Sequence, residues 1–123
     1  MHKPKILIVE DDPTWQCLYQ QGLDGFEVLS ATSVAVARDL FREHAGDVAV
    51  IVLDGYMGVD ALERTTLQFA KDVRMAGFEG PMFASSGDPH LSSQLMEAGC
   101  THRASKDQVF DLIDDLFASK KVA

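Results

Sequence analysis

Acidic side chains stand directly after short apolar stretches of this 123-residue chain. Glu10, Asp11 and Asp12 follow an apolar stretch near the N-terminus. Asp54 follows a second, longer stretch. Carboxylates held about 4 Å apart repel each other by ~4 kcal/mol at an effective dielectric constant near 20. If these groups converge, they must protonate, move apart or bind a cation, and Mg²⁺ suits such oxygen ligands best.

Three other residues that follow apolar stretches could support phosphoryl chemistry at Asp54. A carboxylate can attack phosphorus and form an acyl phosphate, provided that the charge on the equatorial oxygens is neutralised. A bound ion and Lys106 can supply positive charge, and Ser86 can donate a hydrogen bond to a phosphoryl oxygen. Gly87 would let a backbone N–H approach the same group. This set of residues indicates transfer of a phosphoryl group to a carboxylate.

The elements that must position these residues alternate along the chain. Short β-branched stretches predict five strands, at residues 5–9, 26–31, 47–53, 81–85 and, more weakly, 100–105. Amphipathic stretches between them predict helices that start at Pro13 after an Asp12 cap, after Ser33, from Asp60 to Gly77, before Gly99, and from Asp107. Five such units predict an α/β fold, a five-stranded parallel sheet with helices on both faces. Ligands of such sheets bind beyond the carboxyl ends of the strands.

Composition limits the classes of function. An apolar fraction of 46% in 123 residues predicts one domain over residues 1–123. The net charge of −8 argues against a nucleic-acid partner. Cys17 and Cys100 are too few for a disulfide framework. Because no apolar stretch approaches ~20 residues and no leader opens the chain, we expect a soluble cytoplasmic protein without membrane contact.

Four segments, taken in order, resemble the receiver domain of two-component response regulators. The similarity covers essentially the whole chain, as in a stand-alone chemotaxis-type receiver, and it rests on residues 6–13, 52–54, 81–87 and 98–106. The resemblance implies the strand order 2-1-3-4-5 of a flavodoxin-like, doubly wound sheet. It also implies phosphorylation by a histidine kinase or histidine phosphotransfer protein, and signalling to an unknown protein through a conformational change. Such a domain only phosphorylates and dephosphorylates itself, so it is not otherwise an enzyme.

The resemblance assigns a role to each matching residue. It implies that Mg²⁺ is bound by Glu10 (through water), Asp11, Asp54 and the main-chain carbonyl of Tyr56. It makes Asp54 the phosphoacceptor, Ser86 the switch hydroxyl and Lys106 the lysine that pairs with the phosphate. We also expect the ring of Tyr56, two residues past the acceptor, to slow hydrolysis of the acyl phosphate.

Three residues depart from the family pattern. Gly58 and the residues after it replace the usual Met-Pro and Asp-Gly pairs, so the loop after Asp54 is expected to follow another course. Asp107 replaces a proline, so no cis peptide is expected after Lys106. Arg103 replaces the usual switching aromatic residue, which puts the common route to an output face in doubt.

Two other functions remain open at this point. The first is a pseudo-receiver, a binding module of the same fold that is not phosphorylated. The second is a metal-dependent nucleic-acid enzyme of the topoisomerase-primase type, which places Glu after the first strand and D-x-D after the third. Glu10 fits that pattern, but Asp54-Gly55-Tyr56 lacks the second acid. Dehalogenase-like phosphatases need two Asp residues two positions apart, and Glu10-x-Asp12 fails this test.

Overall fold

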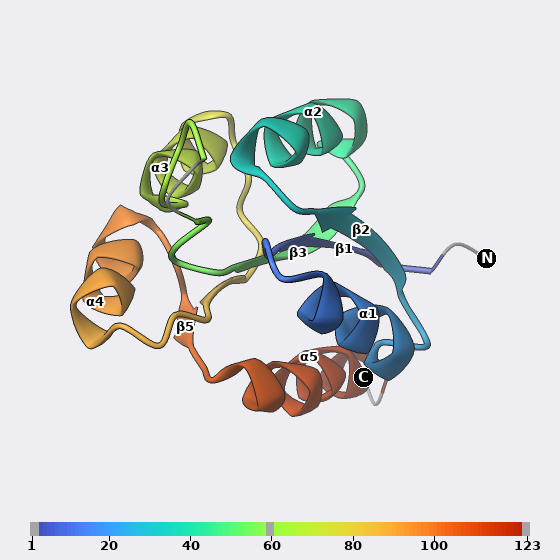
Figure 1. The fold of residues 1–123 in the computed structure, drawn as a ribbon. Helices are drawn as coiled ribbons and strands as arrows, with labels where there is room; N and C mark the ends of the chain where they lie inside the picture. Colours follow the sequence, from blue (N-terminus) through green and yellow to red (C-terminus); the bar gives the residue numbers. More distant parts are fainter. Residues whose placement is uncertain (1–2, 59–60, 122–123) are drawn as a thin grey trace.

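Five parallel strands form one sheet in the computed structural model, which describes residues 3–58 and 61–121. The strand order is β2-β1-β3-β4-β5, which confirms the predicted order (Figure 1). The strands are β1 (Lys5–Val9), β2 (Glu27–Ala31), β3 (Val48–Leu53), β4 (Met82–Ala84) and β5 (His102–Arg103). From β1 the chain adds β2 on one side and then β3 on the other, so the order of strand addition reverses between β1 and β3. Ligands of such sheets bind in a crevice at this point.

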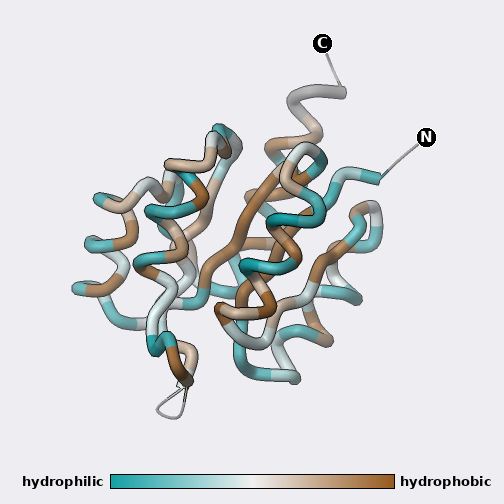
Figure 2. Tube along the Cα trace, turned by 90° about the horizontal axis from the view of Figure 1, so that it is seen from above, coloured by the Kyte–Doolittle hydropathy of each residue, from teal (hydrophilic) through white to brown (hydrophobic). Residues whose placement is uncertain are grey.

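Helices cover both faces of the sheet, as predicted (Figure 1). They are α1 (Pro13–Gly22), α2 (Val34–His44), α3 (Leu67–Met75), α4 (Pro89–Ala98) and α5 (Lys106–Lys121). Side chains of α2, α3 and α4 share one core with one face of the sheet, and those of α1 and α5 share a second core with the other face. Hydrophobic residues accordingly gather along the central strands, and hydrophilic residues lie on the outer helices (Figure 2).

The central strand β1 shows why the sheet is covered on both sides. Ile6 and Ile8 belong to the core beneath α1 and α5, whereas Leu7 and Val9 belong to the core beneath α2, α3 and α4. All four side chains are 0% exposed. Because successive side chains of a strand point to opposite faces, a continuously apolar strand needs two covering layers.

The structure confirms the caps predicted for the first two helices. Asp12 Oδ1 accepts the N–H of Thr14 at 2.9 Å, and Pro13 occupies the first helical position. Ser33 Oγ accepts the N–H of Val36 at 3.2 Å. These caps use side-chain oxygens to satisfy amides that lack a partner within the helix, so both helices begin where the sequence indicated.

The predicted start of the third helix is wrong. We expected it at Asp60, which lies outside the described residues, but α3 begins at Leu67. Leu62 falls within the predicted helix, where its apolar side chain would be expected to face the core, but it is fully exposed. The chain instead forms an antiparallel bridge between Tyr56 and Thr65, so these residues are bonded across the loop and not along a helix. Other boundaries differ by a few residues: β4 and β5 are shorter than predicted, and α5 begins at Lys106.

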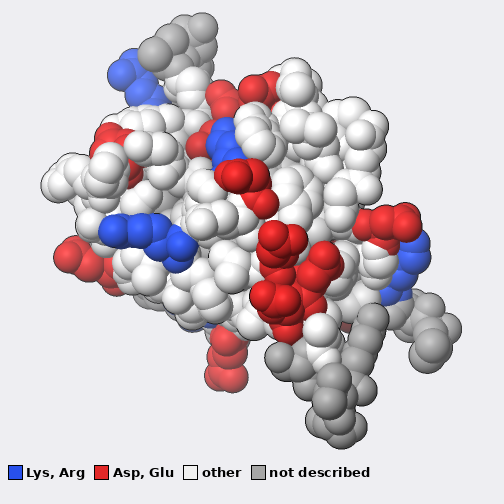
Figure 3. Space-filling model, turned by 90° about the horizontal axis from the view of Figure 1, so that it is seen from below, with Lys and Arg blue, Asp and Glu red and all other residues white. Residues whose placement is uncertain are grey.

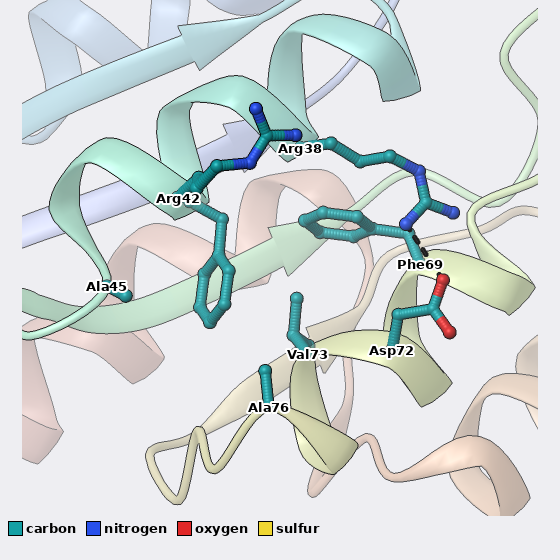
Figure 4. Close-up of a pocket in the computed structure, with 8 residues that line it drawn as sticks. Arg38, Arg42, Ala45, Phe69, Asp72, Val73 and Ala76 are labelled. Atoms are coloured by element: carbon teal, nitrogen blue, oxygen red, sulfur yellow. Dashed lines mark hydrogen bonds and ion pairs between the residues drawn. The ribbon is translucent and has the colours of Figure 1, made fainter.

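One arginine ties this loop to its surroundings. Arg38 on α2 forms two parallel hydrogen bonds of 2.9 Å with the Glu63 carboxylate and a third, of 2.8 Å, with Asp72 on α3. Figure 4 shows Arg38 reaching from α2 to Asp72 beside the ring of Phe69. A cleft of about 350 Å³ lies between the two helices here, and its floor includes Phe69 and Val73. Bidentate pairs of this kind fix the geometry of both partners.

The face covered by α1 and α5 is acidic. In Figure 3, which views the molecule from below, acidic side chains gather on this face and basic ones are few. Helix α1 has no charged residue, whereas α5 carries four aspartates: Asp107, Asp111, Asp114 and Asp115. Such a surface repels a polyanion. Over residues 3–58 and 61–121, no helix combines the length and the apolar character needed to cross a membrane.

Candidate metal site at the carboxyl edge of the sheet

The strand-end acids converge as the sequence predicted. Val9 and Leu53, the last residues of β1 and β3, are partners in the parallel register. The residues that follow them therefore lie side by side at one edge of the sheet. Glu10, Asp11 and Asp54 each offer a carboxylate oxygen, and these oxygens all lie within 4.8 Å of one another.

The donor set fits a hard divalent cation. Glu10 is only 1% exposed, and its Oε1 contacts the Lys106 ammonium. Its other oxygen, Oε2, is buried and has no hydrogen-bond partner among the described residues. A buried carboxylate oxygen without a partner is costly, and a metal ion or its bound water would satisfy it. Glu10, Asp11 and Asp54 thus provide oxygen ligands suited to Mg²⁺, and one of these oxygens, Glu10 Oε2, has no other partner among the described residues.

The surroundings of Asp54 favour its protonated form. Burial raises the pKa of Asp54 well above its ordinary value, and the neighbouring carboxylates of Glu10 and Asp11 raise it further, although Lys106 opposes the shift. Close carboxylates at a site of low polarity favour a shared proton over full ionisation. A divalent cation bound among these carboxylates would compete with that proton.

Lys106 lies at the first position of α5 and reaches back to the acids. Burial by itself would lower the pKa of this ammonium, but Glu10 and Asp54 outweigh that effect and the pKa is raised. The ammonium also lies 5.4 Å from the centre of the Trp15 ring, a cation–π contact. Its direct ion pair is with Glu10, so the lysine stands beside Asp54 without being bonded to it. Among the described residues no peptide is cis, as expected from Asp107.

Ser86 lies close to the residue that follows Asp54. An added Cβ on Gly55 would stand 2.6 Å from Ser86 Oγ, so only a glycine allows this approach. The hydroxyl oxygen accepts the N–H of Asp88 at 3.1 Å. Gly87 is exposed, and a Cβ there would meet no atom within 4 Å. Its assigned contact with a phosphoryl oxygen stays a prediction.

Tyr56 spans two loops at this edge. Its side chain is half exposed, and its hydroxyl donates to Asp88 Oδ2 at 3.1 Å. Asp88 also caps α4 by accepting the N–H groups of His90 and Leu91. The ring therefore connects the loop after β3 with the start of α4. The metal contact assigned to the Tyr56 carbonyl remains a prediction.

Sequence reasoning missed several residues that shape the site. Thr66 is fully buried, and its hydroxyl donates to the main-chain oxygen of Asp54 at 2.8 Å. Gly58 has φ +100°, and a Cβ there would lie 3.4 Å from Asp11 Oδ2. Gln16 bonds to the main chain at the end of β1. Gly58 departs from the family pattern in type, but that departure did not predict its place beside Asp11.

Arg103, at the position of the family's switching aromatic residue, is exposed and hydrogen-bonded to a helix. Its guanidinium donates to Ser93 Oγ on α4 at 2.6 Å, so a hydrogen bond connects β5 with α4. An exposed, hydrogen-bonded arginine cannot turn into the core as an aromatic ring could, because burial would remove a charge from water. The replacement of the family's aromatic residue by Arg103 therefore gives an exposed hydrogen bond to α4 in place of a ring that can turn inward.

Comparisons with known proteins identify the fold. No protein-family model matches the chain, and no curated protein is similar in sequence. A response regulator receiver domain protein from Clostridium thermocellum is 19% identical with a TM-score of 0.75, over 96% of this chain and 97% of that one. The Vibrio cholerae chemotaxis protein CheY4 is 21% identical with a TM-score of 0.74, over 90% and 96%.

A third similar structure contains a modified aspartic acid and a metal ion. It is a response regulator protein from Burkholderia pseudomallei with a phosphorylated aspartic acid, a calcium ion and citrate. It is 15% identical with a TM-score of 0.70, and the match covers 94% of this chain and 74% of that one. Together these matches show that the chain has the receiver-domain fold of response regulators.

Proposed function

We propose that this protein is a response-regulator receiver in which Asp54 accepts a phosphoryl group with Mg²⁺ bound beside it. The observation that carries the proposal is the convergence of Glu10, Asp11 and Asp54 within 4.8 Å, next to the Lys106 ammonium. The solved receiver with a phosphorylated aspartic acid and a calcium ion lends support to this chemistry. The donor would be a histidine kinase or a histidine phosphotransfer protein in the cytoplasm.

Each residue has a role in the proposed reaction. An oxygen of Asp54 attacks the phosphorus, the bond from phosphorus to the donor's histidine nitrogen breaks, and an acyl phosphate remains on Asp54. Glu10 and Asp11 would hold Mg²⁺, which neutralises charge on the transferring group. Lys106 offers a second positive charge, and Ser86 can donate its hydroxyl hydrogen to a phosphoryl oxygen. Water later attacks the phosphorus, which releases phosphate and restores the carboxylate.

Incubation with acetyl phosphate and Mg²⁺, followed by intact-mass measurement, tests the proposal. The wild-type protein should gain one phosphoryl group, and Asp54→Asn should gain none. Omission of Mg²⁺ should also prevent the gain. An unmodified wild-type protein, or equal labelling of Asp54→Asn, would contradict the proposed function.

The position of the Tyr56 ring leads to a prediction about lifetime. The ring is held at the site edge by its bond to Asp88, so it can restrict the approach of water to the acyl phosphate. Tyr56→Asn should lose the label several-fold faster than wild type, because the smaller side chain leaves the path open. Tyr56→Phe keeps the ring but loses the bond to Asp88, so it separates the effect of the ring from that of its hydrogen bond. Equal rates in all three proteins would show that the ring has no such role.

One observation favours a second function, a pseudo-receiver that binds a protein partner without being phosphorylated. Lys106 already pairs with Glu10, so the acid cluster has one cation without any metal. In that case Mg²⁺ would not bind, and the Trp15 fluorescence would not change during an Mg²⁺ titration. The ring of Trp15 lies 5.4 Å from the Lys106 ammonium, so displacement of that lysine by an ion should be visible.

A further inference from the structure

A buried glutamine on α1 makes an unusual set of bonds beside the acid cluster. Gln16 is 5% exposed, and it lies among the apolar side chains that face the sheet. Its Nε2 is 3.0 Å from the carbonyl oxygen of Glu10, 3.0 Å from that of Ala31 and 3.1 Å from that of Ile8. Its Oε1 is buried without a partner among the described residues, so the side chain is used here only as a donor.

These bonds enclose the turn that carries the acids. The main-chain N–H of Gln16 donates to the carbonyl of Asp12 at 3.1 Å, while its side chain donates to the carbonyl of Glu10. One residue thus bonds to both ends of the turn formed by residues 10–12, with Asp11 between them. The N–H of Glu10 also donates to Ala31 at 3.0 Å, so both peptide groups of Glu10 are fixed.

We propose that Gln16 is a positioning residue for the metal site: it holds the turn of residues 10–12 so that Glu10 and Asp11 stay convergent with Asp54. The inference rests on the proposed Mg²⁺-dependent function and extends it to a residue that does not touch the ion. An apolar side chain would fill the same space without leaving a buried oxygen unpaired, so burial alone does not explain a glutamine here. Two of the carbonyls near its amide, those of Ile8 and Glu10, lie where β1 ends and the acids begin, and the third, Ala31, ends the neighbouring strand β2. Because the amide has two hydrogens, one of them is shared between two of these oxygens.

The energetic reason lies in the repulsion between the acids. Three carboxylates within 4.8 Å share a single lysine, Lys106, so repulsion between them persists when no metal is bound. A turn held only by its own backbone would relax and move Asp11 away from Asp54. Side-chain amide bonds to the turn oppose this movement, so the ligands are arranged before the ion arrives. Groups that hold metal ligands in place typically contribute about 10- to 100-fold to metal affinity.

The test replaces Gln16 with methionine, which keeps length and burial but cannot donate. Calorimetric titration of the full chain with MgCl₂ should give an affinity about 10-fold weaker than wild type. Gln20→Met is the matched control on the same helix, since among the described residues Gln20 donates only to the Ser30 hydroxyl. Arg74→Met is a control for lost stability, because Arg74 donates to the carbonyls of Phe78 and Gly99, on the core side away from α1. Both controls should bind Mg²⁺ like wild type.

The outcomes separate this inference from the function on which it rests. Wild-type affinity in a folded Gln16→Met protein would overturn the positioning role and leave the proposed function standing. If wild type itself fails to bind Mg²⁺, both fall. If Gln16→Met does not fold, NMR of the wild-type Gln16 side-chain amide decides: we expect slow exchange with water and a shift on Mg²⁺ addition. A rapidly exchanging or unshifted amide would refute the inference.

Discussion

The two acid-bearing connections of the sheet differ in length and in how they are held. The turn of residues 10–12 after β1 is short, and bonds hold it to three other elements: Gln16 on α1, Ala31 at the end of β2 and Lys106 on α5. The loop of residues 54–66 after β3 is long. Thr66 closes it by bonding back to the main chain of Asp54, and Tyr56 and Glu63 connect it with α4 and α2. The first arrangement fixes two ligands firmly. The second leaves room for a different course without moving Asp54, because Thr66 holds the start of the loop.

The largest effect should come from the short turn. Asp11→Asn removes a charged ligand at the site, so the Mg²⁺ affinity should fall by about 100-fold, the upper end of the range for metal-site changes. Calorimetric titration would measure this loss. The same change at Asp12, which caps α1 and is not part of the cluster, should leave the affinity nearly intact. Equal losses in Asp11→Asn and Asp12→Asn would show that the two acids do not differ in role.

Mg²⁺ binding should depend on pH, and this dependence involves both connections because Asp54 and the turn acids belong to one cluster. The pKa of Asp54 is raised in the ion-free protein, chiefly by burial and then by Glu10. Above the ordinary carboxyl pKa the folded protein therefore holds a proton that the unfolded chain has lost, and stability falls as pH rises. Mg²⁺ must displace this proton, so its affinity should rise by up to about tenfold per pH unit. A pH-independent affinity in calorimetric titrations would contradict the shared proton.

Gly58 lies where the loop meets the turn. With φ +100°, alanine is strained there, so Gly58→Ala should lower the free energy of unfolding by about 1 kcal/mol. Its Cβ would lie 3.4 Å from Asp11 Oδ2, so weaker Mg²⁺ binding should accompany the lost stability. Gly87→Ala is the control, because a Cβ there meets nothing within 4 Å. Urea denaturation and Mg²⁺ titration of both variants would show whether position 58 is special.

The smallest effect on the site should come from the tether of the long loop. Arg38→Met removes the paired bonds to Glu63, and we expect a loss of about 1 kcal/mol after allowance for solvent screening. Mg²⁺ affinity should change by less than about twofold, because Thr66 still holds Asp54. Arg42→Met, which removes only an exposed pair with Asp39, should cost less in urea denaturation. A large drop in Mg²⁺ affinity for Arg38→Met would show that the loop tether and the site are coupled.

The same contrast explains what the sequence could predict. The apolar strands, the helix caps at Asp12 and Ser33 and the strand-end acids depend on local patterns, and the structure has all of them. The start of α3 was wrong because the bridge between Tyr56 and Thr65 depends on contacts across the loop. A periodic pattern that includes Leu62 looks helical until those contacts are known.

Within the site, prediction failed for residues that act through the main chain. Gln16 in α1 and Thr66 just before α3 donate to backbone oxygens. A glutamine within a helix, or a threonine before one, does not by itself indicate such a bond. The contact expected at Gly87 requires a ligand, so the structure leaves it a prediction. The acids themselves were found because charge after a buried strand is conspicuous in any sequence.

The ion pair between Lys106 and Glu10 joins residues 96 positions apart. During folding, β1 and β3 can bring the three acids together well before α5 has docked, and until then the acids lack their only protein cation in the described cluster. Contacts of such sequence separation form late, because a long loop must be closed first. Docking of α5, whose Phe110 packs directly against Gly22 of α1, supplies that cation. Until then a divalent ion is the counter-charge available to the converged acids, so Mg²⁺ should stabilise partly folded molecules in which β1 and β3 have paired.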